Sequence, residues 1–263
     1  MLLYLLVTGG KFMFFSPRNK DVALGMYSTS YFITLAFVII IITLCLFFSF
    51  KMKEKNIKKV LITFNIFTVL TEIIKMIFTG INYGIDDVEW LPLYFCSLFM
   101  YSTLLAVLKN EKLKITGLSF LFFGGIIGAV AFFSYPNACI PNYPLFHFMT
   151  LRTLIYHGGM IYVGLLVVIT GYYKPDLKHF KNYTIYLSVI MLLAYIINII
   201  RDRNLMYISE PLDFSISENL YNLVPKLYPF IFMVLQTVVP FFTSFLFYKL
   251  FLKVNRRKYL CLN

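Results

Sequence analysis

The chain has 263 residues, of which 60% are hydrophobic and 14% charged, and its formal net charge is +12. Soluble domains contain about 45–50% apolar and about 25% charged residues, so this composition excludes an ordinary soluble domain and favours a protein embedded in lipid. The basic residues cluster between apolar segments. We therefore attribute them to membrane topology and predict no nucleic-acid partner.

The first predicted element is a segment at residues 1–29 that precedes the membrane-spanning region. Met1 to Phe15 is mostly apolar, but no basic residue stands before its hydrophobic run, and Gly9, Gly10 and Lys11 interrupt it. These features match neither a cleavable signal peptide nor a complete span. We predict an extracytoplasmic or interfacial segment, or a short half-helix.

The rest of the chain alternates between apolar runs and short polar connections. About 20 residues are needed to cross the hydrocarbon core, and they must be helical because lipid offers no hydrogen-bond partner to an exposed backbone. We predict an all-α polytopic membrane protein with a seven-helix transmembrane domain at 30–250 and a basic cytoplasmic tail at 251–263. The seven transmembrane helices are predicted at 30–50, 60–82, 91–108, 116–134, 147–172, 183–200 and 229–250.

The basic residues between the spans predict the orientation. Sixteen Lys and Arg residues fall after spans one, three and five and in the C-terminal tail, whereas six fall on the opposite side. Because cytoplasmic loops concentrate basic residues, the N-terminus is predicted outside and the C-terminus in the cytoplasm, as an odd number of spans requires. We expect a multi-pass protein of the plasma membrane.

Ionisable side chains within the predicted spans are the most informative polar groups, because a charge at this depth usually faces a partner or a cavity. They are Glu72, Lys75, Arg152 and His157. At 1.5 Å per residue these groups lie roughly 8 to 15 Å below the outer boundary, and Cys96 in span three has a similar depth. Together with Asn198 in span six, they predict one outward-facing cavity.

The charged residues also have structural interpretations. Glu72 and Lys75 are three positions apart on one helix and can neutralise each other. Arg152 can extend its guanidinium to the interface. His157 can be a packing residue, and it pairs better with Thr153, one turn away, than with Arg152, which lies about 140° around the helix.

The histidines and cysteines do not form a metal-binding pattern. His147, His157 and His179 fall at different depths, and we therefore expect no metal and no other cofactor. Cys96 also has an interpretation as a small apolar filler, and Cys45 is interpreted as a core residue of span one.

Several short motifs resemble the YwaF-like family of bacterial integral membrane proteins. In chain order they are Trp90 to Cys96, Gly128-Ala129, Tyr135-Pro136, Leu154 to Gly158, Tyr195 to Asn198, Asn204 to Ile208, and Pro211. The chain departs from the family pattern at Tyr94, where relatives commonly have His, and at Leu205, where they have Tyr. The resembled family includes a eukaryotic branch described as a cysteine-dependent phospholipid acyltransferase.

The resemblance implies a lipid-modifying enzyme, a phospholipid acyltransferase or hydrolase, in which Cys96 is the nucleophile and His157 its base. Its implied partners are a phospholipid, which would enter from the outer leaflet, and a lysolipid acceptor. Tyr94, Asn198 and Arg152 are candidate oxyanion donors. The full set of candidate substrate-binding residues is Arg152, Asn198, Tyr94, Glu72, Lys75, Arg201, Arg203 and Asn204.

Two other functions stay open from the sequence. The intramembrane charges also suit a non-enzymatic binder or transporter of a small molecule or a lipid, although no inverted repeat is visible. A structural or sensory partner of another membrane protein is the third interpretation.

Overall fold

The computed structural model describes residues 13–87, 91–137, 139–212 and 215–260, and this part of the chain contains helices and no strand. The all-α prediction is therefore confirmed for the described residues. Residues 1–12 of the predicted N-terminal segment and Trp90 of the first motif lie outside them.

Six helical segments of the described chain are long and apolar enough to cross a membrane: Thr29–Ser49, Glu54–Tyr83, Glu111–Ser134, Phe148–Ile169, Leu177–Arg201 and Tyr228–Lys253. A π-helical segment at Phe120–Gly125 joins α4 to α5 within the third of these. The helix bounds are α1 Thr29–Ser49, α2 Glu54–Tyr83, α3 Leu98–Leu105, α4 Glu111–Ser119, α5 Ile126–Ser134, α6 Phe148–Ile169, α7 Phe180–Arg201, α8 Ser215–Leu223 and α9 Tyr228–Leu260.

Polar residues at the helix ends explain several of these bounds. The Ser28 side chain accepts a hydrogen bond from the Tyr31 backbone N–H, and Asn110 accepts from two N–H groups at the start of α4. Both satisfy backbone donors that have no partner inside the helix. Asp202 has φ 50°, and this left-handed residue ends α7.

The third predicted span is the element that differs from prediction. The helical part of 91–108 is α3, which has 8 residues, and Leu91 to Ser97 forms turns. Pro92 has no N–H to donate to a helix, and the Phe99 N–H donates to the Cys96 carbonyl at 3.0 Å in a tight turn. Cys96 therefore lies in the turn before α3 and not within a helix.

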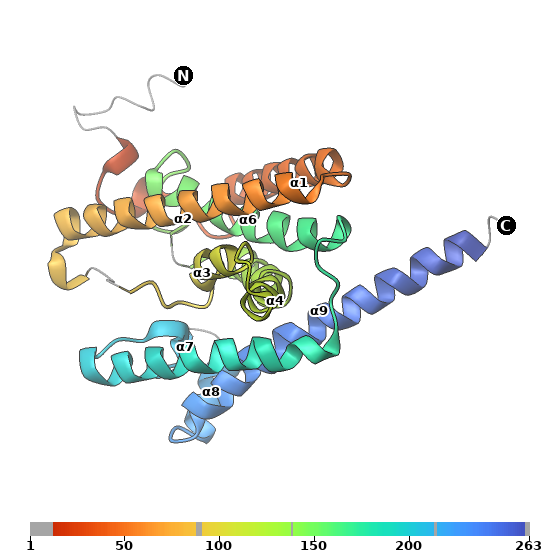
Figure 1. The fold of residues 1–263 in the computed structure, drawn as a ribbon. Coiled ribbons are helices and arrows are strands. Elements are labelled where there is room, and N and C mark those ends of the chain that lie inside the picture. The colour runs from red at the N-terminus through yellow and green to blue at the C-terminus, as the bar shows by residue number, and fades with distance from the viewer. Residues whose placement is uncertain (1–12, 88–90, 138, 213–214, 261–263) are drawn as a thin grey trace.

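The helices form layers that place α3 and α4 at the centre (Figure 1). On one side α1 and α2 pack against α6, and on the other α7 packs against α4 and α9 against the π-helical segment. Large side chains such as Phe99, Phe120, Phe123 and Tyr183 fill the space between the layers and are fully buried. The central position of α3 brings the turn that carries Cys96 between the two layers.

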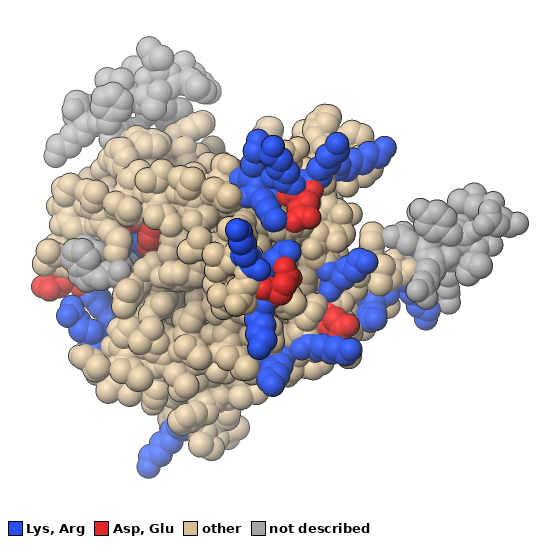
Figure 2. All heavy atoms as spheres, viewed as in Figure 1, with Lys and Arg blue, Asp and Glu red and all other residues tan. Residues whose placement is uncertain are grey.

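The basic connections gather at one end of the bundle, which we call the basic end. It comprises the turn after α1, the turn before α4, the connection from α6 to α7, and the part of α9 from Lys249 onward. The Nζ of Lys114, in the first turn of α4, lies 5.3 Å from the ring centroid of Tyr172, so the start of α4 contacts the connection from α6 to α7. Figure 2 shows Lys and Arg concentrated on this side of the molecule.

Residues 16–28 cover the end of the bundle opposite the basic end. Backbone N–H groups of Asn19 and Leu24 donate to the carbonyls of Asn142 and Tyr143 at 3.0 and 2.9 Å. His147 caps α6 by accepting from the Met149 N–H, and its Nε2 lies 2.9 Å from the Ser16 carbonyl oxygen. The part of the N-terminal segment that is described is thus fixed to the α5–α6 connection.

Close helix contacts occur at glycines, including Gly128 and Gly164. A Cβ on Gly128 would lie 3.1 Å from the ring of Phe95, and one on Gly164 would lie 2.5 Å from the Leu121 carbonyl oxygen. The second distance involves backbone and cannot be relieved by a side-chain rotation. Gly164 therefore sets how closely α6 approaches the π-helical segment.

Replacing Gly164 by alanine is expected to destabilise the protein by roughly 1–3 kcal/mol, because the added methyl overlaps a backbone oxygen. Gly158→Ala on the same helix is the matched control, since its Cβ would meet Val38 at an ordinary 3.4 Å. Thermal unfolding in detergent measures both. Equal melting temperatures for the two variants would contradict the packing argument.

Candidate functional site

A buried cluster of three charged residues joins α2 to α6. The Glu72 carboxylate pairs with Lys75, whose Nζ lies 2.7 Å from Oε1, and with the Arg152 guanidinium, which donates to Oε2. The Glu72 side chain is 7% exposed and that of Arg152 12% exposed. One carboxylate between two cations gives the cluster a formal charge of +1. The expected Glu72–Lys75 ion pair is present. Arg152 also pairs with the Glu72 carboxylate and does not extend to the interface.

Tyr156 connects this cluster to Cys96. The Arg152 Cζ lies 5.3 Å from the centroid of the Tyr156 ring, one turn further along α6. The Tyr156 hydroxyl donates to the Cys96 carbonyl oxygen at 3.2 Å, and its ring packs edge-to-face on Phe99. Tyr156 therefore holds the turn that carries Cys96 against α6.

The Cys96 thiol faces α5. Its Sγ donates to the Gly128 carbonyl oxygen at 3.8 Å, and Phe95 packs beside it over Gly128 and the ring of Phe120. Because Gly128 has no side chain, its carbonyl is accessible to the thiol. The nucleophile candidate is thus positioned by α5 on one side and by Tyr156 on the other.

His157 is held in one orientation by stacking and by a hydrogen bond. Its ring stacks on Phe132 with centroids 3.8 Å apart and an interplanar angle of 13°, and Phe133 lies at its edge. Nδ1 lies 2.9 Å from the Thr153 carbonyl oxygen. Since a carbonyl only accepts, Nδ1 carries the proton in the neutral ring and Nε2 carries the lone pair. The expected pairing with Thr153 is present through its backbone.

Cys96 and His157 contact the same face of α5. Their partners there, Gly128 and Phe132, are four residues apart, which is about one turn or roughly 6 Å along a helix. Among the described residues, the thiol bonds to Gly128 and the imidazole to Thr153 and not to each other. Both groups therefore contact α5 about one turn apart, without a direct hydrogen bond between them.

Asn198 belongs to a different group of residues at the end of α7. Its amide oxygen accepts from the Leu205 N–H at 2.7 Å, and its amide nitrogen donates to the Leu205 carbonyl and to the Ser209 hydroxyl. Asn204 similarly bonds to the backbone of Ser209 and Glu210. These side chains stabilise a turn in which Met206 and Tyr207 have positive φ.

The other candidate substrate residues lie around this turn. Arg203 donates to the Asp86 carbonyl, the Tyr94 ring lies 6.0 Å from that of Tyr207, and Arg201 is exposed at the end of α7. A polar cavity of about 310 Å³ lies here, lined by Asn198, Asp202, Arg203, Asn204 and Glu210 among others. The structure therefore divides the predicted single group into the Glu72–Cys96–His157 region and this cavity at the end of α7.

No group of three or more His, Cys, Asp or Glu side chains in the described ranges is arranged to hold a metal ion.

The comparison with known families matches residues 26–250, from just before α1 to near the end of the membrane-spanning part of α9, to the TMEM164 family. The chain belongs to the TMEM164 family. No curated protein and no solved structure matches it.

Membership of the TMEM164 family supports the general part of the sequence resemblance, a membrane protein with several apolar helices. The YwaF-like bacterial assignment is not what the comparison shows. All the residues of the region around Cys96 lie within the part that matches the TMEM164 family.

Sequence reasoning did not identify three contributors to the region around Cys96. Tyr156, Gly128 and Phe132 position Cys96 and His157, yet Tyr156 and Gly128 were only members of short motifs. The sequence feature that could have indicated them is the order of small and aromatic residues in the segments that contact Cys96 and His157. Cys45, interpreted as a core residue, is exposed and lines a groove between α1, α2 and α6.

Proposed function

We propose that this TMEM164-family protein is a membrane enzyme that transfers an acyl group from a phospholipid through Cys96, with His157 as the base. The proposal is supported by the contacts of both side chains with α5, where the Cys96 thiol bonds to Gly128 and the His157 ring stacks on Phe132 about one turn away, and by the His157 lone pair on the nitrogen that is not bonded to Thr153. A thiol and an imidazole base are the two groups that acyl transfer through a thioester requires.

The chemistry balances without a cofactor. His157 Nε2 takes the thiol proton, and the Cys96 thiolate attacks the ester carbonyl of the phospholipid. The ester C–O bond breaks, the lysophospholipid leaves with the proton from His157, and a thioester remains. A lysolipid hydroxyl, or water in a hydrolase, then attacks the thioester, the C–S bond breaks, and the proton returns to the thiol through His157. The thiol must first rotate away from Gly128.

Arg152 is the candidate donor for the substrate. Its Nε–H is buried and has no hydrogen-bond partner among the described residues, although its Nη2 pairs with Glu72. A buried unsatisfied donor costs about 1–3 kcal/mol, which a phosphate or an oxyanion oxygen would recover. Asn198 is less suited to this role, since its amide oxygen and nitrogen already bond to residues 205 and 209.

The test is an assay of the purified full chain with a phospholipid labelled in its acyl chain and an unlabelled lysolipid. Formation of labelled phospholipid from the acceptor indicates transfer, and labelled free fatty acid indicates hydrolysis. Absence of both products, with the protein folded and the two lipids bound, would contradict the enzymatic proposal.

A second candidate function is binding or transport without chemistry, and the buried +1 cluster of Glu72, Lys75 and Arg152 favours it. A surplus cation inside the membrane suits an anionic or zwitterionic solute. In this alternative Cys96→Ala would be nearly silent, whereas neutralising Lys75 or Arg152 would weaken ligand retention.

The proposed enzyme crosses the plasma membrane seven times, with the N-terminus outside and the basic end in the cytoplasm. The six long helices account for six crossings. Residues 91–105 would supply the seventh, since Cys96 contacts Gly128 at the start of α5 and the end of α3 meets Gly117 of α4, nearer the basic end. The concentration of Lys and Arg at the basic end supports the orientation.

Labelling of introduced cysteines checks this topology. Cysteines replacing Asn142 and Asn219 are expected to react with an impermeant reagent from outside intact cells. A cysteine replacing Lys178, at the basic end, is expected to react only after permeabilisation. Reaction of the Lys178 variant in intact cells would show that the orientation is the opposite of the one proposed.

A further inference from the structure

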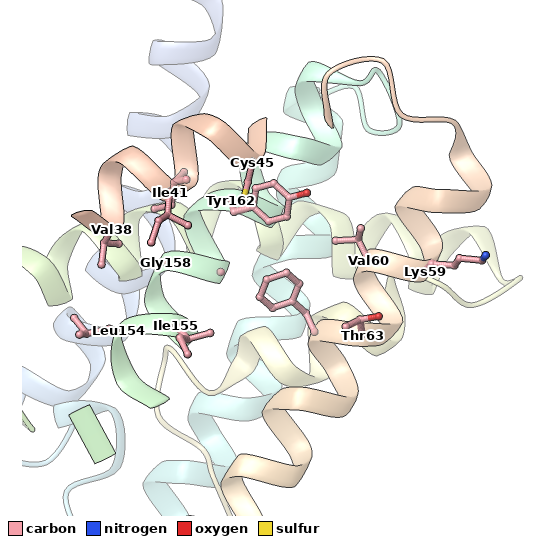
Figure 3. A pocket seen from close by; sticks show the side chains of 13 residues that line it. Val38, Ile41, Cys45, Lys59, Val60, Thr63, Leu154, Ile155, Gly158 and Tyr162 are labelled. Carbon is pink, nitrogen blue, oxygen red and sulfur yellow. The ribbon is translucent and has the colours of Figure 1, made fainter. Parts of the chain in front are cut away.

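An apolar groove runs between α1 and α2 and has α6 as its floor. Both helices pack on α6 much more than on each other, and the space between them has a volume of about 460 Å³. Figure 3 shows Val38, Ile41 and Cys45 on one wall, Val60 and Thr63 on the other, and Gly158 and Tyr162 on the floor. Ile155 on the floor is 51% exposed, so the groove is open on the lipid-facing side.

The groove is separate from the region around Cys96. Gly158 and Gly159 face it, since a Cβ on the first would meet Val38 and one on the second would meet Phe64. Tyr156 and His157 point instead to α3 and α5. Occupancy of the groove therefore does not depend on an enzymatic function of Cys96.

The lining defines what the groove can hold. It is almost wholly apolar, and the Tyr162 hydroxyl already bonds to the Ser49 hydroxyl at 2.9 Å. A pocket of this volume is within the range that holds small ligands, and because few of its lining residues are polar it favours a hydrocarbon chain. An opening towards lipid supplies such chains directly.

A basic residue stands at one end of the groove. Lys59 lines it with its side-chain stem, and in Figure 3 its ammonium points away from the other labelled side chains. Among the described residues no carboxylate pairs with Lys59, whereas Lys58 pairs with Glu54 at 2.8 Å. Four further lysines lie at positions 51, 53, 55 and 58 of the basic end. The field at this end of the groove favours a negative headgroup.

We infer that the α1–α2–α6 groove is a binding site for an anionic phospholipid, which places one acyl chain over Gly158 and Gly159 and its phosphate beside Lys59. The occupant is a lipid of the leaflet that faces the basic end. It stabilises the separation of α1 and α2 by filling the space between them.

The test measures lipid retention by the full chain in detergent, using native mass spectrometry with dioleoylphosphatidylglycerol and dioleoylphosphatidylcholine. We expect the anionic lipid to be retained about fivefold better. Thr63→Trp, which fills the groove, is expected to abolish retention of both, while the adjacent lipid-facing control Ile62→Trp retains them. Lys59→Gln is expected to lose the preference for the anionic lipid, and its control Lys55→Gln to keep most of it.

A second readout uses the wild-type protein, so that it does not depend on the folding of a variant. Cys45 lines the groove as an exposed free thiol, and its alkylation by N-ethylmaleimide can be followed at the peptide level. Phosphatidylglycerol is expected to slow this reaction at lower concentrations than phosphatidylcholine. Equal retention of the two lipids, an anionic preference that survives Lys59→Gln, retention by Thr63→Trp, or an unchanged Cys45 alkylation rate would each overturn the inference.

Discussion

Replacing Cys96 by alanine is expected to abolish acyl transfer, with a loss of at least about 10³-fold, which corresponds to about 4 kcal/mol of transition-state stabilisation. The substitution removes the thiol that forms the proposed thioester. Because Cys96 is fixed through its backbone carbonyl by Tyr156, the shorter side chain leaves the turn before α3 in place. The assay follows labelled phospholipid and labelled fatty acid from the purified variant.

His157 is best tested by His157→Phe. Phenylalanine keeps a planar ring stacked on Phe132 while removing both nitrogens, so the packing is retained and the base is lost. We expect a loss similar to that of Cys96→Ala, and a double variant no worse than either single one, because the two residues act in one step.

Cys139→Ala provides the control for the cysteine substitution. Its thiol accepts a hydrogen bond from Thr153 at 3.3 Å and has no role in the proposed reaction, so turnover should be retained. Robust turnover by Cys96→Ala would end the assignment of Cys96 as the nucleophile. A silent Cys96→Ala together with weaker ligand retention in an Arg152 variant would favour the binder.

The long helices were predictable because about 20 apolar residues bounded by charges admit few other structures in lipid. The segment at 91–108 was not, because an apolar run of that length does not show whether its backbone bonds form a helix or turns. Pro92 was the available signal. That Cys96 lies in a turn became clear only from the structure, in which the Leu98 and Phe99 N–H groups donate to the carbonyls of Phe95 and Cys96.

The candidate site was predictable where sequence spacing alone brings groups together. Glu72 and Lys75 pair because they are three residues apart on one helix. Arg152 pairs with Glu72 only because of how α6 is aligned along α2, and this alignment cannot be predicted from the sequence. Asn198 is a polar residue near the end of a long helix, but its partners, the Leu205 backbone and the Ser209 hydroxyl, belong to a turn that the sequence pattern does not reveal.

The groove at Cys45 illustrates a different limit. Helix α1 is apolar on all sides, so its sequence carries no periodic signal that separates the face packed on α6 from the face towards lipid. Cys45 therefore appeared to be a core residue. The separation of α1 from α2 depends on how both pack on α6, and it places Cys45 on an exposed wall.

Glu72→Gln is expected to be among the most destabilising single substitutions, at about 3–5 kcal/mol. The change keeps the size of the side chain but leaves Lys75 and Arg152 as two buried cations without a carboxylate. Their mutual repulsion and the loss of charge-assisted hydrogen bonds separate α2 from α6. Thermal or denaturant unfolding in detergent measures the effect.

Two further variants show whether the cost arises from uncompensated charge. Glu54→Gln on the same helix breaks the exposed pair with Lys58, whose side chains are 61% and 42% exposed, and should cost less than about 1 kcal/mol. Glu72→Gln combined with Arg152→Gln removes one negative and one positive charge, and should therefore be more stable than the sum of the two single losses predicts. Additive losses, or a Glu72→Gln protein as stable as Glu54→Gln, would show that the carboxylate does not hold the two cations in the folded state. The same additivity would also remove the support that the surplus charge gives to anion binding, because the cluster would then not be coupled through Glu72.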